Sequence, residues 1–167
     1  TPALAVREPA DADWEYEFQG INDREDLAAV AAAISYERVL AQLLRAGVTI
    51  EDPATAYVEA TVHIAEDVTL EPNVTLKGST RIGRDTVIWP ATRIGFRSRI
   101  GEHCWLVCPS LGEAVTLGDF TFVGLNATIA PTVAVGQRNI IGAGALVMRD
   151  TKDDQVYPGH ASAPAEV

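Results

Sequence analysis

Histidine is the side chain best suited to exchange a proton near neutral pH, and this chain has three, His63, His103 and His160. His103, in the segment IGEHCWL, is our candidate for a general base. The alternative is a polar surface residue without a catalytic role. His160, in YPGHASAP near the carboxyl end, is better interpreted as part of a terminal cap.

Arginine follows His63 at two intervals of 18 residues, at Arg81 and Arg99. In a structure that repeats over this length, the three side chains would stack on one outward face. A column of cations can bind the phosphate of a sugar phosphate or of a coenzyme. The alternative is a solvated charged face, which is the commoner role of exposed charge.

The two cysteines, Cys104 and Cys108, are separated by three residues, and no further metal ligand accompanies them. We therefore expect no metal site. Cys104 is expected to be a buried free thiol, which fits a cytoplasmic setting. Cys108 could act as a nucleophile only with a His, Asn or Asp partner, and the spacing identifies none.

These residues lie within a strict six-residue repeat. Its aliphatic positions are Val58, Ile64, Leu70, Leu76, Ile82, Ile88, Ile94, Ile100 and Leu106 and, after a one-residue slip, Leu117, Val123, Ile129, Val135, Ile141 and Val147. A small or β-branched residue stands two positions earlier, and glycine often follows, as at Gly83 and Gly101. A period of six fits neither a helix nor a simple strand, but it is typical of a hexapeptide solenoid.

The repeat predicts what each of its positions does. The aliphatic side chain fills the core, and the small residue fits inside a corner. The glycine is expected to relieve the backbone as the chain turns. One pentad, Ser110–Ala114, interrupts the pattern, either as a tolerated loop or as a functional irregularity beside Trp105 and the cysteines.

A helix is predicted before the solenoid, with Asn22 as its N-cap, Glu25 as the capping-box partner and Gly47 at its end. Its apolar stripe is too wide for solvent and needs a partner surface. The solenoid holds about fifteen hexads, or about five coils at three hexads each. The predicted segments are an extended arm (1–21), the helix (22–47), the β-helix (48–150) and a carboxyl-terminal cap or tail (151–167).

The net charge of −10 argues against a nucleic-acid partner or an anionic membrane, because both need a basic surface. No run of residues was expected to span a membrane, and no signal peptide is visible. We therefore expect a small-molecule acceptor, no nucleic acid and no membrane.

Residues 20–83 resemble the helix-to-solenoid junction of the bacterial bifunctional N-acetylglucosamine-1-phosphate uridyltransferase/glucosamine-1-phosphate acetyltransferases, through NDR, RAGVT…DP and PNVTLKG. Further on, GDFTFVGLNATIAP and IIGAGALVMRD are similar to segments of hexapeptide-repeat sugar O- and N-acyltransferases. The resemblance implies an all-β solenoid, a left-handed parallel β-helix of about five coils preceded by one α-helix. It also implies a homotrimer with acetyl-CoA as co-substrate and no metal.

The resemblance implies the following sites. The cofactor-binding residues would be Gly142, Ala143, Gly144, Ala145, Arg149 and Lys152, and the substrate-binding residues His63, Arg81, Arg99 and Asn126. The glycines would leave room for the pantetheine arm, and the two basic residues would meet the nucleotide phosphates. His103, at a corner facing a neighbouring subunit, would be the catalytic base. The alternatives are that these glycines are ordinary turns and that Asn126 belongs to a stacked asparagine ladder.

Other features depart from the resemblance. The glycine-rich loop of the uridyltransferase and the RPG…VEVK sugar-phosphate segment are not found, and Cys108-Pro109 stand where the sugar acyltransferases often have histidine. The sequence predicts acetyl-CoA-dependent acyl transfer to an amine or hydroxyl of a sugar or nucleotide sugar. The alternative is a non-catalytic trimeric scaffold. A third possibility, a γ-class carbonic anhydrase, would need a His₃ zinc site for which only His63 and His103 are available.

Overall fold

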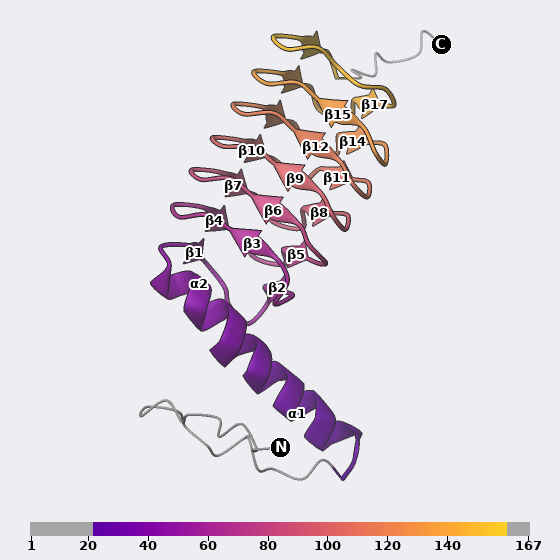
Figure 1. The fold of residues 1–167 in the computed structure, drawn as a ribbon. Helices are drawn as coiled ribbons and strands as arrows, with labels where there is room; N and C mark the ends of the chain where they lie inside the picture. Colours follow the sequence, from indigo (N-terminus) through magenta and orange to yellow (C-terminus); the bar gives the residue numbers. More distant parts are fainter. Residues whose placement is uncertain (1–21, 160–167) are drawn as a thin grey trace, which may run out of the picture. The chain divides into compact units, whose positions relative to one another are not determined.

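The computed structural model describes residues 22–159, in two compact units that divide after Ile34. The first unit contributes helix α1 (Arg24–Ile34). The second begins with the π-helical turn η1 (Ser35–Leu40) and helix α2 (Ala41–Arg45), and continues as a solenoid of short strands (Figure 1). The predicted arm at residues 1–21 and the end of the tail, from His160, lie outside the described residues.

The helix start differs from the prediction by one residue. Asp23, rather than Asn22, caps α1: its Oδ1 accepts hydrogen bonds from the backbone N–H groups of Glu25 (2.8 Å) and Asp26 (2.9 Å). The Asp26 carboxylate in turn accepts one from the N–H of Asn22, at 3.0 Å. After α2 the chain leaves the helix at Gly47, which has a φ of +90° as expected of a helix stop.

The helical region is also apolar enough to qualify as a membrane span, which the sequence analysis did not expect. Arg24–Arg45 covers 22 residues and contains an 18-residue window with a mean hydropathy of 1.4. One such helix near the amino end is weak evidence, because core helices of soluble proteins and signal sequences pass the same test.

All strands of the described region are two residues long and pair in parallel within three sheets. Sheet A orders β1 (Thr49–Ile50), β4 (Thr69–Leu70), β7 (Val87–Ile88), β10 (Trp105–Leu106), β13 (Phe122–Val123), β16 (Ile140–Ile141) and β18 (Val156–Tyr157). Sheet B orders β2 (Tyr57–Val58), β5 (Thr75–Leu76), β8 (Arg93–Ile94), β11 (Ser110–Leu111), β14 (Thr128–Ile129) and β17 (Leu146–Val147). Sheet C orders β3 (His63–Ile64), β6 (Arg81–Ile82), β9 (Arg99–Ile100), β12 (Thr116–Leu117) and β15 (Ala134–Val135).

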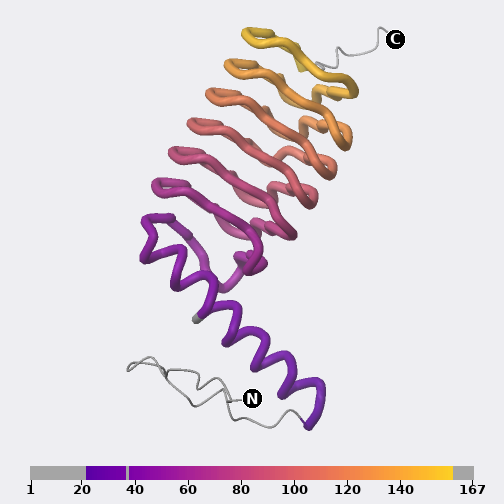
Figure 2. The backbone as a smooth tube through the Cα atoms, in the orientation of Figure 1, coloured from indigo at the N-terminus to yellow at the C-terminus, as the bar shows by residue number. Residues whose placement is uncertain are grey.

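Each coil contributes one strand to each sheet, and the coils stack as Figure 2 shows. The predicted β-solenoid preceded by one helical region is confirmed, with about six coils rather than about five. The additional strands are β1 and β18. The strict period missed them because eight residues separate Ile50 from Val58, and ten separate Val147 from Tyr157.

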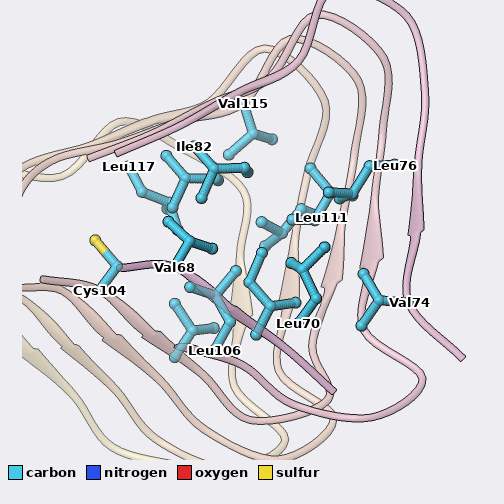
Figure 3. Close-up of a cluster of buried hydrophobic side chains, with 14 of the residues drawn as sticks. Val68, Leu70, Val74, Leu76, Ile82, Cys104, Leu106, Leu111, Val115 and Leu117 are labelled. Atoms are coloured by element: carbon cyan, nitrogen blue, oxygen red, sulfur yellow. The ribbon is translucent and has the colours of Figure 1, made fainter. Parts of the chain in front are cut away.

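The core is formed as the repeat predicts, by aliphatic side chains from all three sheets that converge on one axis (Figure 3). The small positions are buried too, and their hydroxyls donate to backbone carbonyls, as Thr80 does to Lys77 (2.8 Å) and Ser98 to Gly95 (2.8 Å). Cys104 fills the same position in its coil and is 1% exposed, as a free thiol. Burial raises the pKa of the Cys104 thiol to about 11, which makes it a poor nucleophile.

The glycine that follows the aliphatic residue has a different role from the one predicted. The left-handed backbone occurs two residues later, as at Asp85 (φ +53°) and His103 (φ +53°), whereas Gly83 and Gly101 are not among the residues with positive φ. A Cβ on Gly83 would lie 2.6 Å from the carbonyl carbon of Gly101 in the next coil. These glycines are therefore required because successive coils approach too closely at the turn to admit a side chain.

The short step in the repeat lies earlier than predicted. Ser110–Leu111 forms the regular strand β11, and the missing residue belongs to the turn before it, where Leu106 is followed by Leu111 after five positions. Cys108 takes the left-handed position of this turn, with a φ of +48°, and Pro109 is buried in the position of the small inward residue. The irregularity is therefore a shortened turn between sheets A and B.

Gly83→Ala is expected to lower the free energy of unfolding by about 1–3 kcal/mol, because the new methyl group overlaps the backbone of the coil above. Urea titration followed by circular dichroism measures this loss. Glu102→Ala, an exposed position on a turn, is the control and should change stability by no more than about 0.5 kcal/mol. Equal stability of the two variants would show that the coils do not pack as closely as described.

Candidate functional site

The predicted basic column lies on the outer face of sheet C. His63 pairs in register with Arg81, and Arg81 pairs with Arg99. All three side chains are exposed. Among residues 22–159, neither arginine has a carboxylate within ion-pair distance, although the whole chain carries a net charge of −10. The column therefore presents two unneutralised cations that are free to meet an anion.

His103 lies at the corner between sheets C and A, in the turn from β9 to β10. Its Nδ1 is 3.4 Å from Oδ2 of Asp85, which holds the equivalent position one coil earlier. Its ring stacks on Phe120 of the following coil, with centroids 4.7 Å apart and planes at 15°. Asp85 also pairs with Arg84, at 3.2 Å from Nε. The imidazole is thus held from both sides by residues of the same column.

This arrangement suits proton transfer. A carboxylate beside Nδ1 favours the tautomer with its proton on that nitrogen, which leaves the lone pair of Nε2 available. No hydrogen bond joins Nε2 to another residue of the described region, and the side chain is exposed. The sequence analysis missed Asp85 and Phe120, although their offsets of 18 and 17 residues from His103 were visible in the repeat.

The predicted coenzyme segment forms the corner between sheets A and B, in the turn from β16 to β17. Gly144 has a φ of +68°, its N–H donates to the carbonyl of Leu125 at 2.8 Å, and a Cβ there would meet nothing within 4 Å. Asn126 occupies the same corner one coil earlier, with an exposed side chain. Gly144 and Asn126 therefore share one open corner.

The other predicted coenzyme residues are placed differently. A Cβ on Gly142 would collide with the backbone of Gly159, so that glycine makes room for the chain itself rather than for a ligand. Arg149 and Lys152 are exposed, but the segment that carries them leads away from Gly144 toward sheet C, where the N–H of Thr151 donates to the carbonyl of Ala134 at 3.0 Å. No contact in the described region joins these basic residues to the Gly144 corner.

A buried asparagine organises the carboxyl-terminal end of the solenoid. Asn139 is fully buried in a small inward position, and its Nδ2 donates to Oγ1 of Thr151 (2.6 Å) and to the carbonyl of Lys152 (3.0 Å). Its Oδ1 accepts from the N–H of Gln155 at 2.6 Å. The sequence analysis gave this residue no role, because its partners follow no fixed period. It fixes the last irregular rung against the regular coils.

The outer face of sheet A is apolar across successive coils. Its exposed side chains include Trp105, Phe122, Ile140 and Val156, which lie in register, and the rings of Trp89 and Trp105 are 6.5 Å apart. Sheet A is also the face that runs from the His103 corner to the Gly144 corner. The base and the open glycine turn thus lie at opposite edges of one apolar face.

The structure offers no metal centre within residues 22–159: no three His, Cys, Asp or Glu residues there are grouped to hold an ion. His63 belongs to the outer face of sheet C and His103 to the corner beside it, while His160 lies outside the described residues.

Comparison with known proteins relates the chain to one group of bacterial enzymes, although no family model matches it. The bifunctional protein GlmU of Streptococcus equi subsp. zooepidemicus is 40% identical over 157 residues, covering 90% of this chain and 34% of the relative. GlmU of Paenarthrobacter aurescens is 37% identical over 128 residues, covering 77% and 25%. The chain therefore spans about a quarter to a third of the length of these relatives.

A solved structure is also similar: a mutant of perosamine N-acetyltransferase from Caulobacter crescentus, in complex with CoA and GDP-perosamine. It has a TM-score of 0.51 and 25% sequence identity, covering 74% of this chain and 62% of that chain. Together these relatives confirm the resemblance drawn from the sequence, to the bifunctional enzyme and to the hexapeptide-repeat acyltransferases.

Proposed function

We propose that this chain, a hexapeptide-repeat homologue of GlmU, transfers an acetyl group from acetyl-CoA to an amine or hydroxyl of a sugar or nucleotide sugar. The observation that carries the proposal is His103, an exposed imidazole 3.4 Å from Asp85 at the edge of an apolar face whose other edge is the open turn at Gly144. The similar perosamine N-acetyltransferase was solved with CoA and a nucleotide sugar, which supports both substrate classes.

The same geometry supports a homotrimer. In a closed ring, one edge of each subunit meets the opposite edge of the next. If the apolar face of sheet A turns toward the ring axis, the His103 corner of one copy meets the Gly144 corner of its neighbour. Exposed aromatic side chains such as Trp105 and Phe122 are what such an interface buries. Each active site would then belong to two subunits.

The heights of the two corners along the solenoid are compatible with this site. His103 immediately precedes β10, whereas Gly144 follows β16, two strands further along sheet A. At a strand spacing of about 4.8 Å, the two differ by roughly 10 Å in height. Asn126 lies between these levels. A coenzyme arm running along the corner from Gly144 past Asn126 would bring its thioester down to the level of His103.

The reaction follows from these positions. Nε2 of His103 removes a proton from the acceptor amine or hydroxyl as that atom attacks the thioester carbonyl carbon. The resulting tetrahedral intermediate collapses by breaking the carbon–sulfur bond, and the coenzyme A thiolate takes the proton from the imidazolium. Asp85 holds the ring in position and stabilises its positive charge. Arg81 and Arg99, on the adjoining sheet C, would receive a phosphate group of the acceptor.

The second candidate function is a non-catalytic trimeric scaffold. It is favoured by the shortened turn, in which Cys108 and the buried Pro109 stand where the sugar acyltransferases often have histidine. A cytoplasmic location is proposed for either function, supported by the free thiols of Cys104 and Cys108. Recovery of the chain in the membrane fraction of lysed cells would count against that location.

Calorimetry with acetyl-CoA separates enzyme from scaffold. We expect binding by the unmodified chain and its loss in Gly144→Trp, because the indole would fill the open corner. Ala91→Trp is the matched control: it is exposed, has a φ of +56° and lies at the same corner three coils earlier, so its binding should be retained. Absence of binding by the unmodified chain would favour the scaffold.

His103→Ala is expected to lower turnover by about 10²–10⁴-fold, measured as thiol release from acetyl-CoA with a panel of amino sugars and nucleotide sugars. A mixture of two inactive variants tests the shared site. Co-refolding His103→Ala with Gly144→Trp in equal amounts leaves about one quarter of the interfaces with both groups intact, so activity should return to that fraction. No recovery would place base and coenzyme in the same subunit or remove them from the site.

Trp105→Ser tests the face used for assembly. Loss of this exposed indole should weaken the trimer, seen in sedimentation as a shift toward monomer at equal protein concentration. Leu146→Ser, an equally exposed apolar position on sheet B, should leave the trimer intact. The opposite pattern would assign the interface to sheet B.

A further inference from the structure

A second hollow lies on the outer face of sheet B, away from the corner that holds His103. It has a volume of about 340 Å³, within the lower range of small-molecule sites. Its floor is formed by Ile94 and Leu111, which are 6% and 5% exposed. Gly95, which has no side chain, leaves this floor accessible between neighbouring coils.

One wall of the hollow is aromatic. Phe96 is 44% exposed and packs against the backbone of the coil below, where a Cβ on Gly78 would lie 3.2 Å from its ring. That contact seats the ring on the preceding coil while leaving part of it toward the hollow. An aromatic surface over an aliphatic floor suits the apolar side of a sugar ring.

Two cations line the same hollow without a carboxylate partner. Within residues 22–159, neither Lys77 nor Arg93 has an ion pair, and the Lys77 ammonium instead lies 5.2 Å from the centre of the Tyr57 ring. Arg138, by contrast, is held 2.6 Å from Asp154. In a chain with a net charge of −10, two unneutralised cations in one hollow indicate a site for an anion.

A carboxylate completes the lining. Glu113 stands at the edge of the hollow, 3.8 Å from Arg97, so its position is set by an ion pair outside the cavity. Carboxylate oxygens accept hydrogen bonds from hydroxyl groups. The hollow therefore combines two phosphate-binding cations, an aromatic wall and a hydroxyl acceptor.

We propose that this hollow is a second, non-catalytic binding site for a phosphorylated sugar. The phosphate meets Arg93 and Lys77, the ring lies against Phe96, and a hydroxyl donates to Glu113. The site does not depend on the proposed acetyl transfer, since sheet B does not border the His103 corner.

Calorimetry on the full chain, with glucose 6-phosphate, glucose and inorganic phosphate as probes, tests the proposal. Glucose 6-phosphate should bind more tightly than either fragment, because both halves of the site are used. Arg93→Ala should weaken this binding about tenfold, the loss expected for one charge-assisted hydrogen bond. Phe96→Ala should reduce the affinity for glucose 6-phosphate toward that for phosphate alone.

Arg81→Ala, which removes an unpaired arginine from sheet C instead, is the matched control and should bind normally. Binding that survives Arg93→Ala but is lost in Arg81→Ala would overturn the proposal and assign the sugar phosphate to sheet C. Equal affinity for glucose 6-phosphate and phosphate would overturn it too. Acetyl-CoA binding by Arg93→Ala should be unchanged, so failure of this site leaves the proposed acetyl transfer intact.

Discussion

The close stacking of successive coils is the constraint on which the rest of this structure depends. Each coil donates its strand N–H groups to the next, as Arg81 does to Ser98 (2.9 Å) and Gly83 to Ile100 (2.9 Å). Because the coils lie one strand spacing apart, a turn that crosses another turn has no room for a side chain. That is why Gly83 and Gly101 are needed, and why every coil repeats the positions of the one before it.

The same constraint sorts functional residues into columns. A residue can be supported only by those one coil before and after it at the same position, so Asp85, His103 and Phe120 act as a unit although 17 or 18 residues separate them. The column gives a short polar contact on one side of the imidazole and an aromatic surface on the other. A solenoid thus builds a supported base from single residues in three consecutive coils.

The sequence predicted the regular part of this structure and missed the irregular part, for a physical reason. A period of six identifies the core positions, the small inward residues and the alignment of His63 with Arg81 and Arg99. It says nothing where spacing varies, so β1, β18 and the role of Asn139 were missed, and the short turn at Cys108 was placed too late. The handedness of the coil came only from resemblance, because spacing does not determine it.

The outward direction of every corner explains why one copy does not form the proposed catalytic site alone. His103 and Gly144 border the same sheet but belong to different corners, so their free surfaces point away from one another. Bringing the coenzyme to the base therefore requires the complementary corner of another copy, and the apolar face between the two corners supplies the contact area. In such an assembly, residues that stabilise the interface, such as Trp105, would also set the distance between donor and base.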